Sequence, residues 1–275
     1  MKADIAFGQY CEGSSFLHKL DPRWKIILAI FYIVIIFLCK NVFTFILVAL
    51  SAVALIALSE IKPVIILRSL RPLIFIICFT AVINIFWLRG ETLLVDFYFI
   101  HIYLEGIINA FLIVVRVIML VSITSIMLTY TTTPIALTDA IEQLLAPLAK
   151  LKVPVHEFSM MMTIALRFIP TLIEETEKIM NAQKARGADF STGSLAKRAK
   201  ALIPILIPLF ISAFRRADEL ACAMECRCYT GGEGRTRMNI LHSSYRDYVA
   251  LAALVLLLVA VVLMNMYLPG YSLSM

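Results

Sequence analysis

The sequence predicts an all-α membrane protein, with about five transmembrane helices and a block of long amphipathic helices between spans four and five. Of the 275 residues, 61% are hydrophobic and 16% are charged, and the mean hydropathy is +0.90. Soluble domains are about 45–50% apolar and about 25% charged. The charges are also unevenly placed, because residues 131–247 hold 27 of the 44 charged side chains. Apolar runs lie before and after that block.

Five apolar runs approach the length of about 20 residues that a helix needs to cross a membrane. They are residues 24–42, 43–59, 72–88, 102–130 and 248–268. Only Lys40 and Asn41 separate the first two, so we expect a tight hairpin there. Pro72 begins the third run and Pro269 follows the fifth, as expected of a residue that cannot continue a helix. The predicted domains are residues 1–130 with four spans, residues 131–247 with the polar block, and residues 248–275 with the fifth span.

The placement of lysine and arginine predicts the orientation. If the N-terminus is cytoplasmic, residues 1–25, 59–71 and 131–247 lie inside and hold 22 of the 25 basic residues. The outer loops hold two, Lys40 and Arg89. This asymmetry is typical of membrane proteins, so we expect a cytoplasmic N-terminus and polar block and an external C-terminus. It also accounts for the net charge of +6 without a nucleic-acid partner. Acidic residues precede the first run, so we expect no cleaved secretory signal.

The polar block shows helical patterns in three segments. The first begins at residues 131–134, where three threonines offer caps and Pro134 suits the first turn. The second, residues 155–186, would be about 48 Å long as one helix, and we expect Pro170 to kink or divide it. In the third, an apolar stretch at 201–214 precedes a charged one. The apolar halves are short for a span, so we expect them at the membrane surface or packed on the membrane helices.

The second and third segments repeat each other at an offset of 41 residues. Residues 182–187 (AQKARG) match residues 223–228 (AMECRC), so that Arg186 and Arg227 occupy equivalent places between small residues near a helix end. One explanation is a cation that complements the dipole at the helix C-terminus. The other is an exposed guanidinium that forms a forked bond with a partner carboxylate. The repetition favours the second explanation.

At these residues the chain resembles the T component of energy-coupling factor (ECF) transporters, of the EcfT/CbiQ-like family, over nearly its whole length. The opening string at residues 15–23 (SFLHKLDPR) looks like the family signature before the first span. Residues 131–134 (TTTP) and 166–170 (LRFIP) stand where family members carry similar strings. Residues 185–187 resemble the first Ala-Arg-Gly motif, and residues 226–237 resemble the second motif together with its glycine-rich continuation. In the second motif, cysteines replace the usual Ala and Gly.

The resemblance implies a scaffold subunit of an ABC-type importer in the cell (inner) membrane of a bacterium or archaeon. Two cytoplasmic ATPase subunits would each receive one motif of the coupling helices. The binding residues would be Ala185, Arg186 and Gly187 for one ATPase, and Cys226, Arg227 and Cys228 for the other. A small S component in the lipid bilayer would capture a vitamin or metal ion. The T component would convert ATPase closure into movement of that partner.

We find no residues for chemistry of the chain's own, and so predict a subunit that is not an enzyme. No Gly-x-x-x-x-Gly-Lys-Ser/Thr phosphate loop occurs, and ATP would be hydrolysed by the partners. Cys222, Cys226 and Cys228 cluster, but no histidine is nearby and the familiar zinc spacing is absent. We therefore expect no metal and no cofactor.

Arg116 stands half-way along the fourth run, where a charge is costly and commonly functional. It could pair structurally with Glu105 or with another subunit, or it could take part in conformational coupling. The alternative function is a stand-alone channel or secondary transporter, gated by Arg116 and regulated by the polar block. Secondary transporters commonly repeat their membrane spans, whereas the repeat here lies in the polar block.

Overall fold

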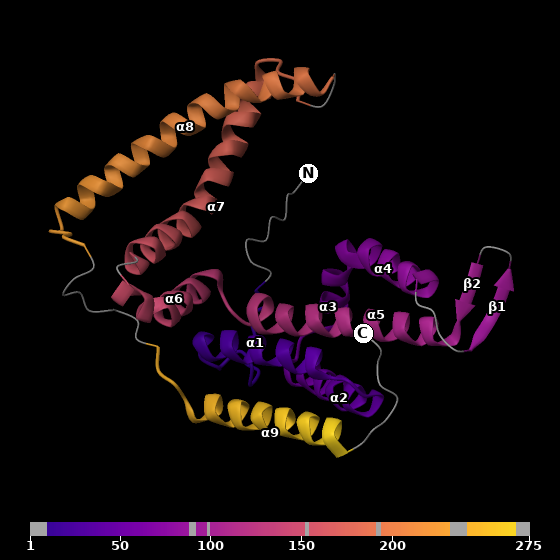
Figure 1. Ribbon diagram of the computed structural model, residues 1–275. Coiled ribbons are helices and arrows are strands. Elements are labelled where there is room, and N and C mark those ends of the chain that lie inside the picture. The colour runs from indigo at the N-terminus through magenta and orange to yellow at the C-terminus, as the bar shows by residue number, and fades with distance from the viewer. Residues whose placement is uncertain are drawn as a thin grey trace. The chain divides into compact units, whose positions relative to one another are not determined.

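The computed structural model describes residues 10–87, 92–97, 100–151, 154–190, 194–231 and 241–267, and Figure 1 labels its elements. The chain forms two compact units. Unit 1 is Met1–Ala140 together with Ile240–Met275, and unit 2 is Ile141–Asn239. The chain therefore leaves unit 1 once, after Ala140, and returns to it once, at Ile240.

Unit 1 is built from apolar helices that pack side by side. Its helical elements are α1 (Pro22–Leu38), α2 (Val42–Leu58), α3 (Pro63–Leu70), the short 3-10 turn η1 (Arg71–Leu73), α4 (Ile74–Trp87), α5 (Leu104–Thr124), the π-helical turn η2 (Ser125–Tyr130) and α9 (Tyr245–Tyr267). In Figure 1, α1 and α2 lie between α5 and α9, and both pack against those two helices. The buried core draws on all four, with Ile35, Val48, Ile123 and Val261 among its least exposed members.

Among the residues that the structure describes, three helical stretches are long and apolar enough to cross a membrane: Pro63–Phe86, Leu104–Tyr130 and Tyr245–Tyr267. Two shorter apolar helices, α1 and α2, have 17 residues each and stand where the first two spans are predicted. Large apolar side chains cover the outside of unit 1, for example Phe75, which is 78% exposed. Apolar patches of this extent need a lipid or protein cover. The predicted class, an all-α membrane protein, is confirmed.

Two details of unit 1 differ from the prediction. The third apolar stretch begins at Pro63 instead of Pro72, because the helical path continues through η1, which contains Pro72. A proline lacks only its own N–H donor, and a tight turn tolerates that loss. The second difference is an antiparallel hairpin of β1 (Leu93–Phe97) and β2 (Ile100–Tyr103) ahead of α5. These residues are rich in β-branched and aromatic types, which favour strands.

Within its described residues, unit 2 consists of helices joined by turns and irregular segments. Helix α6 (Pro134–Leu145) starts in unit 1 and continues into unit 2, where η3 (Ala146–Leu151), α7 (Val155–Ala185) and α8 (Leu195–Glu225) follow. The predicted helix start at Pro134 is confirmed, and the Thr133 hydroxyl accepts a hydrogen bond from the Ala136 N–H at 3.3 Å.

Helices α7 and α8 have 31 residues each. Pro170 lies inside α7, so of the two expected effects, a kink or a division, the division does not occur. Pro204 and Pro208 likewise lie inside α8. A proline removes one helical hydrogen bond, and the many remaining bonds keep each helix continuous.

Candidate functional site

The first predicted arginine stands where α7 ends. Gly187 follows Arg186 with a φ of +87°, in the left-handed region that favours glycine. Its N–H donates to the Lys184 carbonyl at 2.9 Å, and the Ala188 N–H donates to the Gln183 carbonyl at 3.0 Å. This pair of bonds is a Schellman motif, which satisfies the last carbonyls of a helix. Arg186 is therefore the last residue before the chain turns away from the helix axis.

The second predicted arginine, Arg227, stands in the same motif at the end of α8. The Cys228 N–H donates to the Glu225 carbonyl at 2.8 Å, and the Tyr229 N–H donates to the Met224 carbonyl at 3.1 Å. Cys228 has a φ of +55°, so this cysteine adopts the left-handed conformation that Gly187 adopts in the first motif. The replacement of glycine therefore leaves the helix end intact, at the steric cost of a Cβ in this region.

Both arginines are accessible. The residues on either side are small, and all six motif residues are exposed: Ala185, Arg186, Gly187, Cys226, Arg227 and Cys228. In the described part of the chain, neither guanidinium forms an ion pair with a carboxylate. Each helix end therefore presents a long, charged side chain whose hydrogen-bond donors are open to a partner.

Helices α7 and α8 contact each other at equivalent positions of the repeat. The Glu175 carboxylate accepts hydrogen bonds from Ser212 Oγ at 2.5 Å and from Arg216 Nη2 at 3.0 Å, and Glu175 and Arg216 are 41 positions apart. The bond from Ser212, with the bond and charge of Arg216, holds the pKa of Glu175 below its ordinary value. Each motif arginine lies 11 residues beyond this contact on its own helix, which is about 16 Å of helix. The repeat thus forms two helical arms of equal length, residues 175–186 and residues 216–227, each running from the contact to its arginine.

Within the described structure, many large apolar side chains of α7 and α8 remain exposed. The exposed large side chains are Phe158, Met161 and Met162 on α7, and Leu202, Ile203, Leu206, Ile207, Phe210, Ile211 and Phe214 on α8. On α8 they recur every three or four residues, so they form one stripe along the helix. A stripe of this length needs an apolar partner or a membrane surface.

Arg116, the predicted intramembrane residue, lies against the turn between α1 and α2. Its Nη2 donates to the Cys39 carbonyl at 3.5 Å, and its guanidinium lies 6.0 Å from the centre of the Phe45 ring. Its Nε is buried without a hydrogen-bond partner in the described structure. Glu105 instead accepts a bond from Thr92 Oγ1 at 2.7 Å and lies about 16 Å from Arg116 along α5. Of the alternatives considered for Arg116, the pair with Glu105 does not form.

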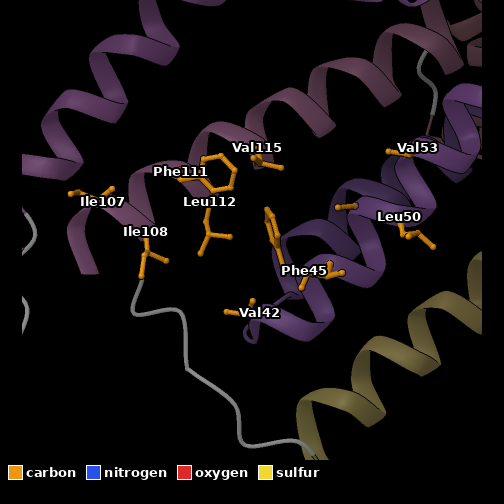
Figure 2. A pocket seen from close by; sticks show the side chains of 11 residues that line it. Val42, Phe45, Leu50, Val53, Ile107, Ile108, Phe111, Leu112 and Val115 are labelled. Carbon is orange, nitrogen blue, oxygen red and sulfur yellow. The ribbon is translucent and has the colours of Figure 1, made fainter. Parts of the chain in front are cut away.

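Phe45 also lines an apolar groove between α2 and α5, with a volume of about 790 Å³ (Figure 2). Its other lining residues are Val42, Ile46, Ala49, Leu50, Val53, Ile107, Ile108, Phe111, Leu112 and Val115. Figure 2 shows Phe45 directed toward α5, where Leu112 and Phe111 lie opposite it. Arg116 thus adjoins one wall of a groove that has no charged lining residue of its own.

Lys25 and Asp247 are buried charged residues that the sequence analysis did not single out, and both make contacts at the start of α1. Lys25 is only 1% exposed. Its Nζ donates to the Thr131 carbonyl at 2.7 Å, to Thr132 Oγ1 at 3.3 Å and to the His18 carbonyl at 3.4 Å. An ammonium has three donors, and each has an acceptor here. The stretch of three threonines at residues 131–133 therefore anchors to α1 as well as starting α6.

Asp247, which is 0% exposed, lies in the first turn of α9 and joins α9 to the start of α1. Its Oδ1 accepts from the Asp21 N–H at 2.9 Å, and its Oδ2 accepts from the Ser244 N–H at 2.6 Å. Asp21 in turn binds the Arg23 guanidinium at 2.7 Å, and Arg23 Nη2 donates to the Leu241 carbonyl at 2.8 Å. We call Asp21, Arg23, Lys25, Thr131 and Asp247 the junction cluster. Asp21 and Arg23 belong to the string at residues 15–23, which the sequence analysis identified. The sequence did not show which residues they would contact.

Two further features singled out in the sequence are the cysteine cluster and the glycine-rich string that follows it. Cys222, Cys226 and Cys228 are exposed, and no group of three potential metal ligands occurs within the described ranges. The glycine-rich string that comes after Tyr229 lies outside the described residues from 232 onward.

Comparison with known proteins agrees with this architecture. The sequence model of the CbiQ family, described as "Cobalt transport protein", matches residues 13–238. Relatives named "Energy-coupling factor transporter transmembrane protein EcfT" include one from Ruminiclostridium cellulolyticum, 52% identical over 96% of this chain and 98% of the relative. Another, from Bacillus subtilis, is 44% identical over 94% of this chain and 97% of the relative. The chain therefore belongs to the CbiQ/EcfT family, the transmembrane components of energy-coupling factor transporters.

Proposed function

We propose that the chain couples ATP hydrolysis by two cytoplasmic ATPase subunits to movement of a membrane-embedded S component, which carries a vitamin or metal ion into the cell. Arg186 and Arg227 would each bind an acidic groove on one ATPase. The chain itself would perform no hydrolysis.

The observation that carries the proposal is the equivalence of the two helix ends. Both arginines precede a left-handed residue in a Schellman motif, both are exposed, and both lie 11 residues beyond the Glu175–Arg216 contact. Two equal arms suit two similar partners. A guanidinium also suits carboxylate recognition, because its forked donors bind both oxygens at once. When the two partners move together, rigid helices transmit that displacement.

The remaining parts of the proposal concern the membrane. We infer five spans, α1, α2, the α3–α4 stretch, α5 with η2, and α9, with a cytoplasmic N-terminus and an external C-terminus. The excess of basic residues in the segments on the inner side supports this orientation. Residues 131–247 then lie in the cytoplasm. The uncovered apolar stripe of α8 would receive the S component, whose own surface is expected to be apolar.

The experiment is charge reversal at both arms, Arg186→Glu with Arg227→Glu, in the complete transporter. We expect the ATPase subunits to be lost from the detergent-purified complex and uptake to be abolished, because each glutamate would repel the acidic groove. Membrane insertion should be unchanged. Arg198→Glu is the matched control, since Arg198 is an exposed arginine at the opposite end of α8.

Unchanged co-purification and uptake in the double variant would refute the coupling role of these arginines. Purification of the wild-type chain as a lone, transport-competent oligomer would refute the whole proposal and support the channel or secondary-transporter alternative.

A further inference from the structure

The junction cluster holds both chain connections between the units to one short segment. Lys25 binds the Thr131 carbonyl shortly before the chain leaves unit 1 at Ala140. Arg23 binds the Leu241 carbonyl directly after the chain returns at Ile240. The segment that leaves unit 1 and the segment that returns to it are thus both hydrogen-bonded to the first turn of α1, at Lys25 and Arg23.

The hydrogen-bonding capacity of the two buried charged groups, Lys25 and Asp247, is satisfied. All three donors of the Lys25 ammonium and both oxygens of the Asp247 carboxylate have partners, and four of these five partners are backbone groups. Bonds to the backbone fix the path of the chain itself, where apolar contacts would allow it to slide. Charged groups that are 1% and 0% exposed are costly to bury, and they are stable only when they are fully partnered.

We propose that Lys25 and Asp247 are positioning residues for energy coupling: they make the two connections a rigid joint through which displacement of unit 2 moves α1 and α9. The inference rests on the proposed function. Without the joint, residues 131–133 and 241–244 would bend locally, and the displacement would be lost there. ATP hydrolysis would then continue without a matching movement of the S component.

The geometry explains why two different residues are needed. Lys25 holds the connection that leads into α6, and Asp247 holds the turn that precedes α9 by its bond to the Ser244 N–H. Asp21 links the two sides, because its own N–H donates to Asp247 and its carboxylate binds Arg23. Replacement of Lys25 should therefore release the segment that leads into α6, and replacement of Asp247 should release the turn that precedes α9. In each case the other segment stays in place.

The test uses the complete transporter, with both ATPases and the S component, in sealed vesicles. Uptake and ATP hydrolysis are measured on the same preparation for Lys25→Met and Asp247→Asn. We expect both ATPases to co-purify as in the wild type, and ATP hydrolysis to persist. Uptake per ATP hydrolysed should fall at least about fivefold, the lower end of typical coupling between sites.

A matched control separates positioning from stability. Tyr32 is 2% exposed in the same unit, and its hydroxyl donates to the Val48 carbonyl at 3.2 Å and lies 2.5 Å from Ser51 Oγ. Tyr32→Phe thus removes buried hydrogen bonds outside the cluster. We expect it to lower the melting temperature without changing uptake per ATP. Thr132→Val removes only one acceptor of Lys25, at 3.3 Å, and should lower uptake per ATP by a smaller factor.

Wild-type uptake per ATP in Lys25→Met and Asp247→Asn would overturn the inference. So would an equal loss in Tyr32→Phe, because the effect would then follow stability alone. If the first two variants fail to fold, Thr132→Val decides, and an unchanged ratio there overturns the inference as well. These results are distinct from the test of the proposed function, in which charge reversal at Arg186 and Arg227 removes the ATPases themselves.

Discussion

The clearest quantitative prediction concerns Gly187→Ala at the end of α7. The added Cβ would meet no atom within 4 Å, so steric crowding by neighbours contributes nothing. The remaining cost lies in the backbone, because Gly187 has a φ of +87°. Holding a residue with a Cβ in the left-handed region costs about 1 kcal/mol. We therefore expect the Schellman motif to open more often, and the affinity of the T component for its ATPases to fall about fivefold.

The assay is a titration of purified ATPase subunits onto the T component in detergent, with the melting temperature measured on the same samples. Cys228→Gly is the reciprocal change, since Cys228 has a φ of +55° and glycine removes the strain. Its affinity should rise, by at most about fivefold. Gly231→Ala is the control, with a φ of +101°, open surroundings and no part in either motif's bonds. Unchanged affinity in Gly187→Ala, or a change of the same sign in Cys228→Gly, would show that the left-handed residue does not present the arginine.

Two further outcomes depend on single contacts. Because the pKa of Glu175 is lowered by Ser212 and Arg216, its contribution to the α7–α8 contact is complete above the ordinary carboxyl pKa and is lost as the pH falls through the lower pKa of the folded protein. Glu175→Gln should abolish this acid-side decrease in the melting temperature, and an identical pH profile in the variant would contradict the assignment. Arg116→Met should lower uptake, yet change the stability by less than about 1 kcal/mol, because it loses one long bond to Cys39 and removes a buried Nε that has no hydrogen-bond partner in the described structure. A large fall in melting temperature would instead assign Arg116 a structural role.

Several elements could be predicted from residue pattern alone. Apolar runs place the membrane helices, because lipid offers no hydrogen bonds and a spanning helix must be apolar along its length. Threonines before Pro134 predict the start of α6, since caps and proline act within one turn. The offset of 41 residues predicts two like helix ends, and the backbone bonds at Gly187 and Cys228 have the same pattern at that offset.

Other features escaped prediction because they depend on competing local signals. Pro72 and Pro63 are both acceptable starts for a helix, and only the path through η1 chooses Pro63. Pro170 suggests a break by its missing donor, but the other hydrogen bonds of α7 outweigh it. The β1–β2 hairpin lies among apolar residues whose pattern suits a strand or a buried helix equally well.

By itself, the sequence determined that this chain is a helical membrane protein of the CbiQ/EcfT family, and that two arginines recur at equivalent helix ends. These properties arise from composition, short periodicity and local motifs, which act within a few turns of chain. Only the tertiary structure decided that Glu175 meets Arg216, that Arg116 faces Cys39, and that Lys25 and Asp247 close one junction. Asp21 and Asp247 are 226 positions apart, and contacts over such separations arise only when the packed helices bring the residues together.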